Sequence, residues 1–130
     1  NRTHMIRVPD KGRFELRLMD GAVNPYLLQA GVIASGLHGI NHKINQGEPL
    51  SCNMYTDHKN YPNLKKLPDT IEEALDQLED SKEINDALGE DIIKSYIKLK
   101  RSEIENFDQE EEFNKKDAVT EWEKNSTLDC

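Results

Sequence analysis

The sequence is poor in cysteine and in long apolar runs. Its two cysteines, Cys52 and Cys130, are too few for a disulfide framework, and their spacing matches no zinc or redox motif. No apolar run reaches the roughly 20 residues that cross a bilayer, and no signal-peptide pattern is present. These features predict a reducing, cytoplasmic setting and no membrane partner.

Hydrophobic residues are also scarce, at 35% of the 130 residues against 32% charged. One domain with one modest core is expected, and part of the chain is expected to need a partner surface or to stay disordered. The net charge is -8, and residues 69–130 hold 20 acids against 8 bases. Such an acidic chain is not expected to bind nucleic acid. Only residues 1–20 are basic, with five bases against three acids, and a local cationic cluster more often meets a small anion.

Residues 3–18 have the pattern of a β-hairpin. Residues 3–8 and 13–18 alternate, and the turn cluster 9–12 separates them. In the second run, apolar positions 14, 16 and 18 share one face, while Arg13, Glu15 and Arg17 share the other. Arg2 and Arg7 join from the neighbouring strand or its edge. The pattern alone favours a solvated face with cross-strand ion pairs over its alternative, a polyanion site.

The rest of the chain predicts mainly helix, so the expected fold class is α+β. Asn24 and Pro25 are a good helix start, and the apolar helix of about 24–44 is expected to be buried on nearly all sides. Residues 45–69 show no period and predict a long irregular segment. Asp69 or Thr70 then caps a helix of about 69–79. Helices follow at 82–88 and at 90–106, the last with Arg101 paired to the residue four positions on.

Several motifs follow one another in a fixed order within residues 1–107. They are Asn1-Arg2, Ile6-Arg7-Val8-Pro9, Arg13-Phe14-Glu15-Leu16-Arg17, Asp20-Gly21-Ala22-Val23-Asn24-Pro25-Tyr26-Leu27, Ala34–Ile40, Leu67–Leu75 and Tyr96–Glu103. In this order they resemble the C-terminal part of the catalytic domain of glutamine synthetases. The resemblance implies that residues 1–107 belong to that domain, while residues 108–130 form an acidic extension, either a further helix or a loosely held arm.

The resemblance implies an ATP-dependent ligase. In this family the side-chain carboxylate of glutamate attacks the γ-phosphate of ATP, and ammonia then displaces phosphate from γ-glutamyl phosphate. Mg²⁺ or Mn²⁺ neutralises the phosphoryl oxygens. The intact enzymes are homo-oligomeric rings.

Residue roles are implied by motif position. Arg2 matches the arginine that approaches the transferring phosphate, Arg7 a second phosphate-side arginine, and Arg13 an arginine of the nucleotide phosphates. Glu15 matches a carboxylate ligand of the metal, and Arg17 the arginine near the carboxylate of substrate glutamate. Guanidinium groups suit bidentate contacts to these anions. With the resemblance, the anion-site interpretation is preferred.

A tyrosine in the irregular segment has two interpretations. Tyr55 lies where some bacterial members carry a tyrosine that is nucleotidylated. The residues after it differ from theirs, and a loop tyrosine that packs on the helix is the favoured interpretation.

The chain is expected to be a piece of a longer ligase that is inactive alone, because Asn1 lies directly before a predicted strand and one metal-ligand carboxylate cannot hold a metal pair. Two alternatives stay open: a stand-alone interaction or regulatory module derived from this region, and a γ-glutamyl-amide ligase that uses another amine. Reading the gene upstream of Asn1 separates the fragment from the module, and substrate profiling of the full-length enzyme identifies the amine.

Overall fold

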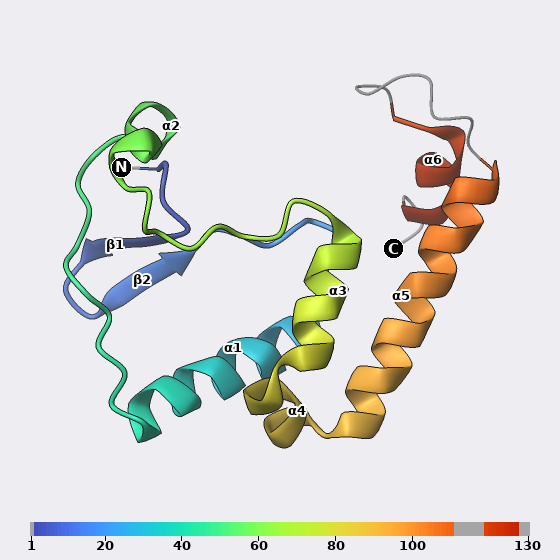
Figure 1. Ribbon diagram of the computed structural model, residues 1–130, viewed down its shortest axis with the longest axis horizontal. Helices are drawn as coiled ribbons and strands as arrows, with labels where there is room; N and C mark the ends of the chain where they lie inside the picture. The colour runs from blue at the N-terminus through green and yellow to red at the C-terminus, as the bar shows by residue number, and fades with distance from the viewer. Residues whose placement is uncertain (1, 111–118, 128–130) are drawn as a thin grey trace.

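The computed structural model describes residues 2–110 and 119–127. Asn1 and residues 111–118 and 128–130, which include much of the predicted extension, lie outside the described residues. The elements in chain order are β1 (Ile6–Asp10), β2 (Arg13–Leu16), α1 (Pro25–Asn41), α2 (Met54–Asp57), the 3₁₀ turn η1 (His58–Asn60), α3 (Ile71–Asp80), α4 (Lys82–Leu88), α5 (Glu90–Glu110) and α6 (Glu121–Thr127). An antiparallel hairpin is followed by a mainly helical region (Figure 1), so the predicted α+β class is confirmed.

The hairpin is shorter than the sequence pattern predicts. Ile6 pairs with Leu16 and Arg7 with Glu15, and the register then shifts before Asp10 meets Arg13. Pro9 lies in this irregular stretch of β1, where its missing N–H breaks no ladder bond. The regular pairing that fixes the polar face is therefore confined to the pairs Ile6–Leu16 and Arg7–Glu15.

Helix α1 begins where the sequence predicts. The Asn24 side chain accepts hydrogen bonds from the backbone N–H groups of Tyr26 and Leu27, and Pro25 occupies the first turn. The helix ends at Asn41 rather than near residue 44. The N–H of Lys43 donates to Ile40 and that of Ile44 to Gly39, with Lys43 at φ 51°, which is a Schellman motif.

The prediction that α1 is buried nearly all round is wrong for this chain. Within α1, all of which the structure describes, only Ala34 is buried, and Tyr26 remains 81% exposed. One side of the helix packs on α4 and faces the hairpin. No described element covers the other side. A helix that is apolar on all sides needs packing partners on all sides to be buried, and the described part of this chain provides them on one side only.

The core lies between α3, α4 and α5. Leu75, Ile93 and Ile97 are its buried residues. Around them pack the half-buried Leu78, Ile84, Leu88, Tyr96 and Ile104. Ile92 and Leu99, also on α5, are exposed.

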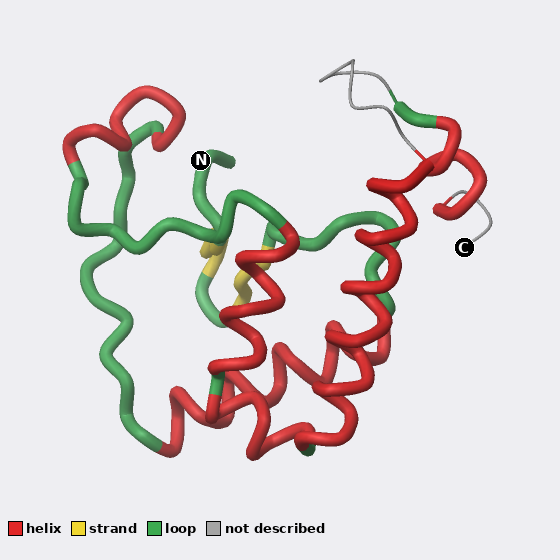
Figure 2. Tube along the Cα trace, turned by 45° about the vertical axis from the view of Figure 1, so that its right-hand side comes forward, coloured by secondary structure: helices red, strands yellow, loops and turns green. Residues whose placement is uncertain are grey.

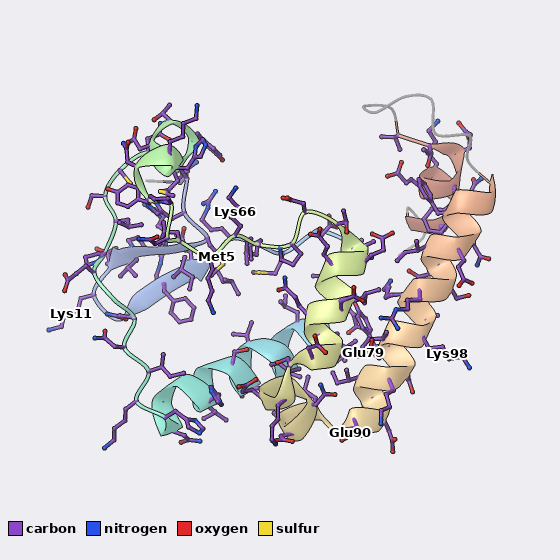
Figure 3. All side chains as sticks on the ribbon, viewed as in Figure 1. Met5, Lys11, Lys66, Glu79, Glu90 and Lys98 are labelled. Atoms are coloured by element: carbon purple, nitrogen blue, oxygen red, sulfur yellow. The ribbon has the colours of Figure 1, made fainter. Side chains whose placement is uncertain are left out.

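Charged contacts join two of these helices, α3 and α5. Thr70, not Asp69, caps α3 by accepting from the N–H of Glu73. Arg101 of α5 contacts Asp76 at 3.0 Å and Glu79 at 2.7 Å, so the predicted contact within α5 is replaced by contacts between helices. Figure 3 shows Glu79 on the side of α3 that faces α5, while Lys98 points away from it.

The segment 45–69 returns from the end of α1 past the hairpin to α3 (Figure 2). It is not wholly irregular, since it contains α2 and η1. The backbone N–H of Met54 donates to the Thr3 hydroxyl at 2.9 Å, which ties this segment to the start of the hairpin. At the other end of the molecule, Phe107 and Trp122 make an edge-to-face contact that joins α5 to α6. None of the described helices is long and apolar enough to cross a bilayer.

Candidate functional site

The polar face of the hairpin gathers three arginines around one carboxylate. The Arg7 Nη1 lies 3.0 Å and 3.1 Å from the two oxygens of Glu15. Arg13 Nη2 lies 2.7 Å from the same carboxylate, and Arg17 Nη1 lies 3.9 Å from it. We call Arg7, Arg13, Glu15 and Arg17 the arginine cluster.

The backbone explains this arrangement. Arg13, Glu15 and Arg17 are two residues apart, so they project from the same face of the strand and its continuation. Arg7 is the register partner of Glu15 on β1 and adds its guanidinium from across the hairpin. The Arg17 N–H donates to the Met5 carbonyl at 2.9 Å, which keeps the chain extended beyond β2. The predicted common face is therefore present.

The opposite face of the hairpin is apolar and faces the helices across a groove. Ile6, Phe14 and Leu16 line a groove with a volume of 680 Å³, whose other walls include residues of α1, α3, α4 and α5. The apolar face of the hairpin is thus turned to the helical region, and the arginine cluster lies on the opposite face.

Charge in the cluster is unbalanced. Hydrogen bonds from Arg13 first, and then from Arg7, hold the pKa of the Glu15 carboxyl below its ordinary value of 4.5. One carboxylate cannot neutralise three guanidinium groups, so the cluster keeps an excess positive charge. The Arg13 side chain is 62% exposed, twice the fraction of Arg7. The cluster can therefore offer donors to a further anion from the Arg13 side.

Arg2 stands apart from this arrangement. It is exposed in the segment before β1. In the part of the chain that the structure describes, it makes no ion pair, and the carboxylate that joins the other three arginines does not reach it. The structure thus brings together four of the five residues predicted for the hairpin site.

A metal ion would find only one ligand in the cluster. Glu15 supplies a hard carboxylate of the kind that Mg²⁺ and Mn²⁺ accept. Residues 2–110 and 119–127 contain no group of three or more potential metal-ligating His, Cys, Asp or Glu side chains. Both Glu15 oxygens also accept from Arg7. Glu15 fits as one ligand of a shared metal, and the remaining ligands would have to come from substrate or from other protein segments.

Tyr55 lies on α2, away from the helical core. It is 77% exposed, so the expectation that it packs on a helix is wrong. Asn53 caps α2 through the N–H of Tyr55. The bond between Thr3 and Met54 places this short helix beside the start of the hairpin. No periodic pattern in the sequence signals that contact, because its partners are 51 residues apart.

Comparison with known proteins agrees with the motif order. Residues 1–125 match the family described as "Glutamine synthetase, catalytic domain". A glutamine synthetase of Rhizobium meliloti is 44% identical over 129 residues, which are 99% of this chain and 28% of that protein. The gamma-glutamylethanolamide synthetase GlnA4 of Streptomyces coelicolor is 38% identical over 126 residues, covering 95% of this chain and 24% of that protein.

A solved structure extends the likeness to the fold. The structure described as "GmaS/ADP complex-Conformation 1" superimposes with a TM-score of 0.78 at 38% identity, covering all of this chain and 28% of that one. This chain spans about a quarter of the length of the relatives it matches. By sequence, motif order and fold, the chain belongs to the glutamine synthetase family and matches part of its catalytic domain.

Proposed function

We propose that this chain forms one wall of the active site of an ATP-dependent glutamate–ammonia ligase. The observation that carries the proposal is the arginine cluster, four motif residues held on one face in a chain of this family. In the proposed reaction, the side-chain carboxylate of glutamate attacks the γ-phosphate of ATP and ADP leaves. Ammonia then attacks the acyl carbon of γ-glutamyl phosphate, and phosphate leaves as glutamine forms. The relative solved with ADP supports an adenine nucleotide as cosubstrate.

Each arginine has a role that its surroundings support. Arg13, the most exposed of the cluster, binds the nucleotide phosphates. Arg7 binds on the phosphate side, and the exposed Arg2 approaches the transferring phosphoryl group. Fixed guanidinium donors stabilise the charge that builds on the phosphoryl oxygens.

Arg17 is proposed to bind the carboxylate of substrate glutamate. Its Nη1 is 3.9 Å from Glu15, the loosest contact in the cluster. Its donors are therefore the least engaged within the protein, and they remain for a ligand carboxylate.

Glu15 is proposed to have two successive partners. Without nucleotide, it holds Arg7 and Arg13 in place. When phosphates take over the arginine donors, its oxygens become free to contribute one ligand to Mg²⁺ or Mn²⁺. That metal would neutralise phosphoryl charge when bound.

The remaining metal ligands and the rest of the site are proposed to come from the other part of a full-length chain, in a homo-oligomer in the cytoplasm. The exposed apolar side of α1 supports a need for such a partner surface. We therefore expect no turnover from the 130-residue chain with ATP, glutamate, ammonia and Mg²⁺. A stand-alone binding module remains the alternative if the gene begins near Asn1.

A second candidate activity uses an amine other than ammonia. It is favoured by the 38% identity to a gamma-glutamylethanolamide synthetase. The two candidates share the arginine cluster and differ only in the amine, so substrate profiling of a full-length enzyme with ammonia and ethanolamine separates them.

The ligase proposal is tested with a chimera. This chain replaces the corresponding segment of the Rhizobium meliloti glutamine synthetase, and ADP release is measured with glutamate and each amine. We expect ligase activity within about tenfold of the parent enzyme, because the fold and the site residues are kept. A folded, assembled chimera that forms no γ-glutamyl product from either amine would contradict the proposal.

Tyr55 is proposed as a site of nucleotidylation, supported by its exposure on α2. The chimera is incubated with ATP and an extract that nucleotidylates the parent, and the adduct is located by mass spectrometry. The adduct is expected on Tyr55 and not on Tyr26, which is exposed to a similar extent. A Tyr55→Phe variant that still carries the adduct would count against this assignment.

A further inference from the structure

Helix α1 ends in a pair of histidines that the proposed ligase does not use. His38 and His42 are four residues apart, and their ring centroids lie 4.1 Å apart with the ring planes at 29°. His38 is half-buried and His42 is exposed. The pair therefore lies on one face of the last helical turn, open to solvent from the His42 side.

The hydrogen bonds of His42 fix which nitrogen is free. Its Nδ1 lies 2.9 Å from the backbone carbonyl oxygen of His38. A carbonyl oxygen only accepts, so Nδ1 carries the hydrogen, and the neutral ring has its lone pair on Nε2. A histidine that donates one ring N–H to a backbone carbonyl while the other nitrogen is free has the arrangement of a metal-bound histidine.

The spacing and the helix end point the same way. Two histidines at i and i+4 bring two imidazoles to one helix face, the spacing that holds zinc in the H-E-x-x-H helix. Gly39 stands where that motif has its glutamate, so the pair lacks a general base and is suited to binding rather than hydrolysis. His42 is also the C-cap of α1, and the partial negative charge at a helix C-terminus favours a cation.

We propose that His38 and His42 together bind a late divalent transition-metal ion such as Zn²⁺, with water in the remaining positions. Nitrogen ligands distinguish this site from the oxygen ligand at Glu15, which suits Mg²⁺. The stacked rings tilt so that their lone pairs converge on the ion, a rotamer change that solvent-accessible side chains make within nanoseconds.

The test uses the full 130-residue chain with Cys52→Ser and Cys130→Ser, so that no thiol competes for the ion. Zn²⁺ is titrated by calorimetry, and imidazole nitrogen resonances are followed by NMR. We expect one ion per chain, with Nε2 of His42 as the perturbed nitrogen and no competition from equimolar Mg²⁺. His38→Ala and His42→Ala should each weaken binding about tenfold or more, because a single imidazole loses the chelate.

Two controls separate chelation from the mere presence of histidine. His58→Ala removes a histidine on η1 and should leave the affinity unchanged. Ile40→His in the His42→Ala background restores the number of histidines but places the second ring two residues from His38, off the shared face, so it should not restore binding. Circular dichroism checks that each variant keeps its helices. Unchanged affinity in either single variant, or full recovery with Ile40→His, overturns the proposal.

Discussion

Arg7 and Glu15 face each other across the hairpin as register partners, with one guanidinium nitrogen 3.0 Å and 3.1 Å from the two carboxylate oxygens. This contact and the one from Arg13 at 2.7 Å make Glu15 the shared acceptor of the arginine cluster. The cluster is thus held together by its single anion, and that has consequences for pH dependence and for catalysis.

The first prediction concerns acid stability. Arg13 and Arg7 lower the pKa of Glu15 in the folded state, so the unfolded state binds more protons between the lowered value and the ordinary 4.5. The contribution of Glu15 to the free energy of unfolding is therefore fully present above its ordinary pKa. It is lost as the pH falls through the lowered pKa of the folded state. NMR of the Glu15 carboxyl should give a midpoint below 4.5 that rises more in Arg13→Ala than in Arg7→Ala.

The control for that titration is Glu15→Gln. In this variant, the part of the pH dependence of unfolding that comes from the Glu15 carboxyl should vanish. Among the described residues, Glu90, whose pKa is lowered by Lys94, and Glu123, whose pKa is lowered by the backbone and hydroxyl of Thr120, should contribute to the pH dependence of stability that remains. If the Glu15 midpoint in both arginine variants is unchanged from that of the parent chain, the ion pairs do not form in solution.

The second prediction concerns catalysis in the full-length chimera. Arg17→Ala should raise the KM for glutamate, and Arg13→Ala the KM for ATP, each by about tenfold or more, because each loses a charge-assisted hydrogen bond to its own substrate. Steady-state kinetics with one substrate varied at a time measures both. Lys11→Ala, at the hairpin turn far from the helices (Figure 3), is the matched control and should change neither constant. If Arg13→Ala and Arg17→Ala change the KM for ATP and the KM for glutamate equally, the assignment of Arg13 to ATP and of Arg17 to glutamate is wrong.

The third prediction concerns the core between α3 and α5. Leu75 is 4% exposed and contacts Ile93 and Ile97. Leu75→Ala should lower the free energy of unfolding by about 2–5 kcal/mol, since it removes buried carbons and leaves a cavity. Urea unfolding followed by circular dichroism measures this change. Leu99→Ala alters an exposed leucine of α5 and should cost below about 1 kcal/mol; a comparable loss would mean that the exposed side of α5 is covered in solution.

The fourth prediction concerns the end of α1. Lys43 holds a left-handed backbone at φ 51°, a conformation that is strained for a residue with a Cβ. Lys43→Gly should raise the free energy of unfolding by up to about 1 kcal/mol, even though glycine gains more freedom in the unfolded chain. Asn41→Gly, two residues earlier in the helix, should lower it by a similar amount. A Lys43→Gly variant that is less stable than the parent would show that the Schellman motif does not persist.

Local patterns were read correctly at the Asn24 cap and along the alternating strand around Glu15, but not at the end of α1 or in α2. The Asn24 cap involves residues two and three positions on, and the alternation around Glu15 involves neighbours two positions away. Both follow from backbone geometry alone. The family follows from motif order for the same reason, since each motif is a short local run.

Predictions failed where the deciding partner is distant. Arg101 was expected to pair within α5, yet it contacts Asp76 and Glu79 on α3 because those two helices pack together. The prediction that α1 is buried failed for a similar reason. The apolar residues of a helix show that it needs packing partners, but they do not show which segment provides them. The bond from Met54 to Thr3 has no local signal at all.

The sequence by itself therefore determined the polar face of the hairpin, the start of α1 and the family, because each rests on spacing of a few residues. Only the tertiary structure decided which arginines meet Glu15, which side of α1 is covered, and where Tyr55 lies. These depend on chain segments packing at a distance. Alternation placed Arg13, Glu15 and Arg17 on one face, and Arg2 and Arg7 were both expected beside it. The register of β1 against β2 decided that Arg7 joins Glu15, whereas Arg2 makes no ion pair with it.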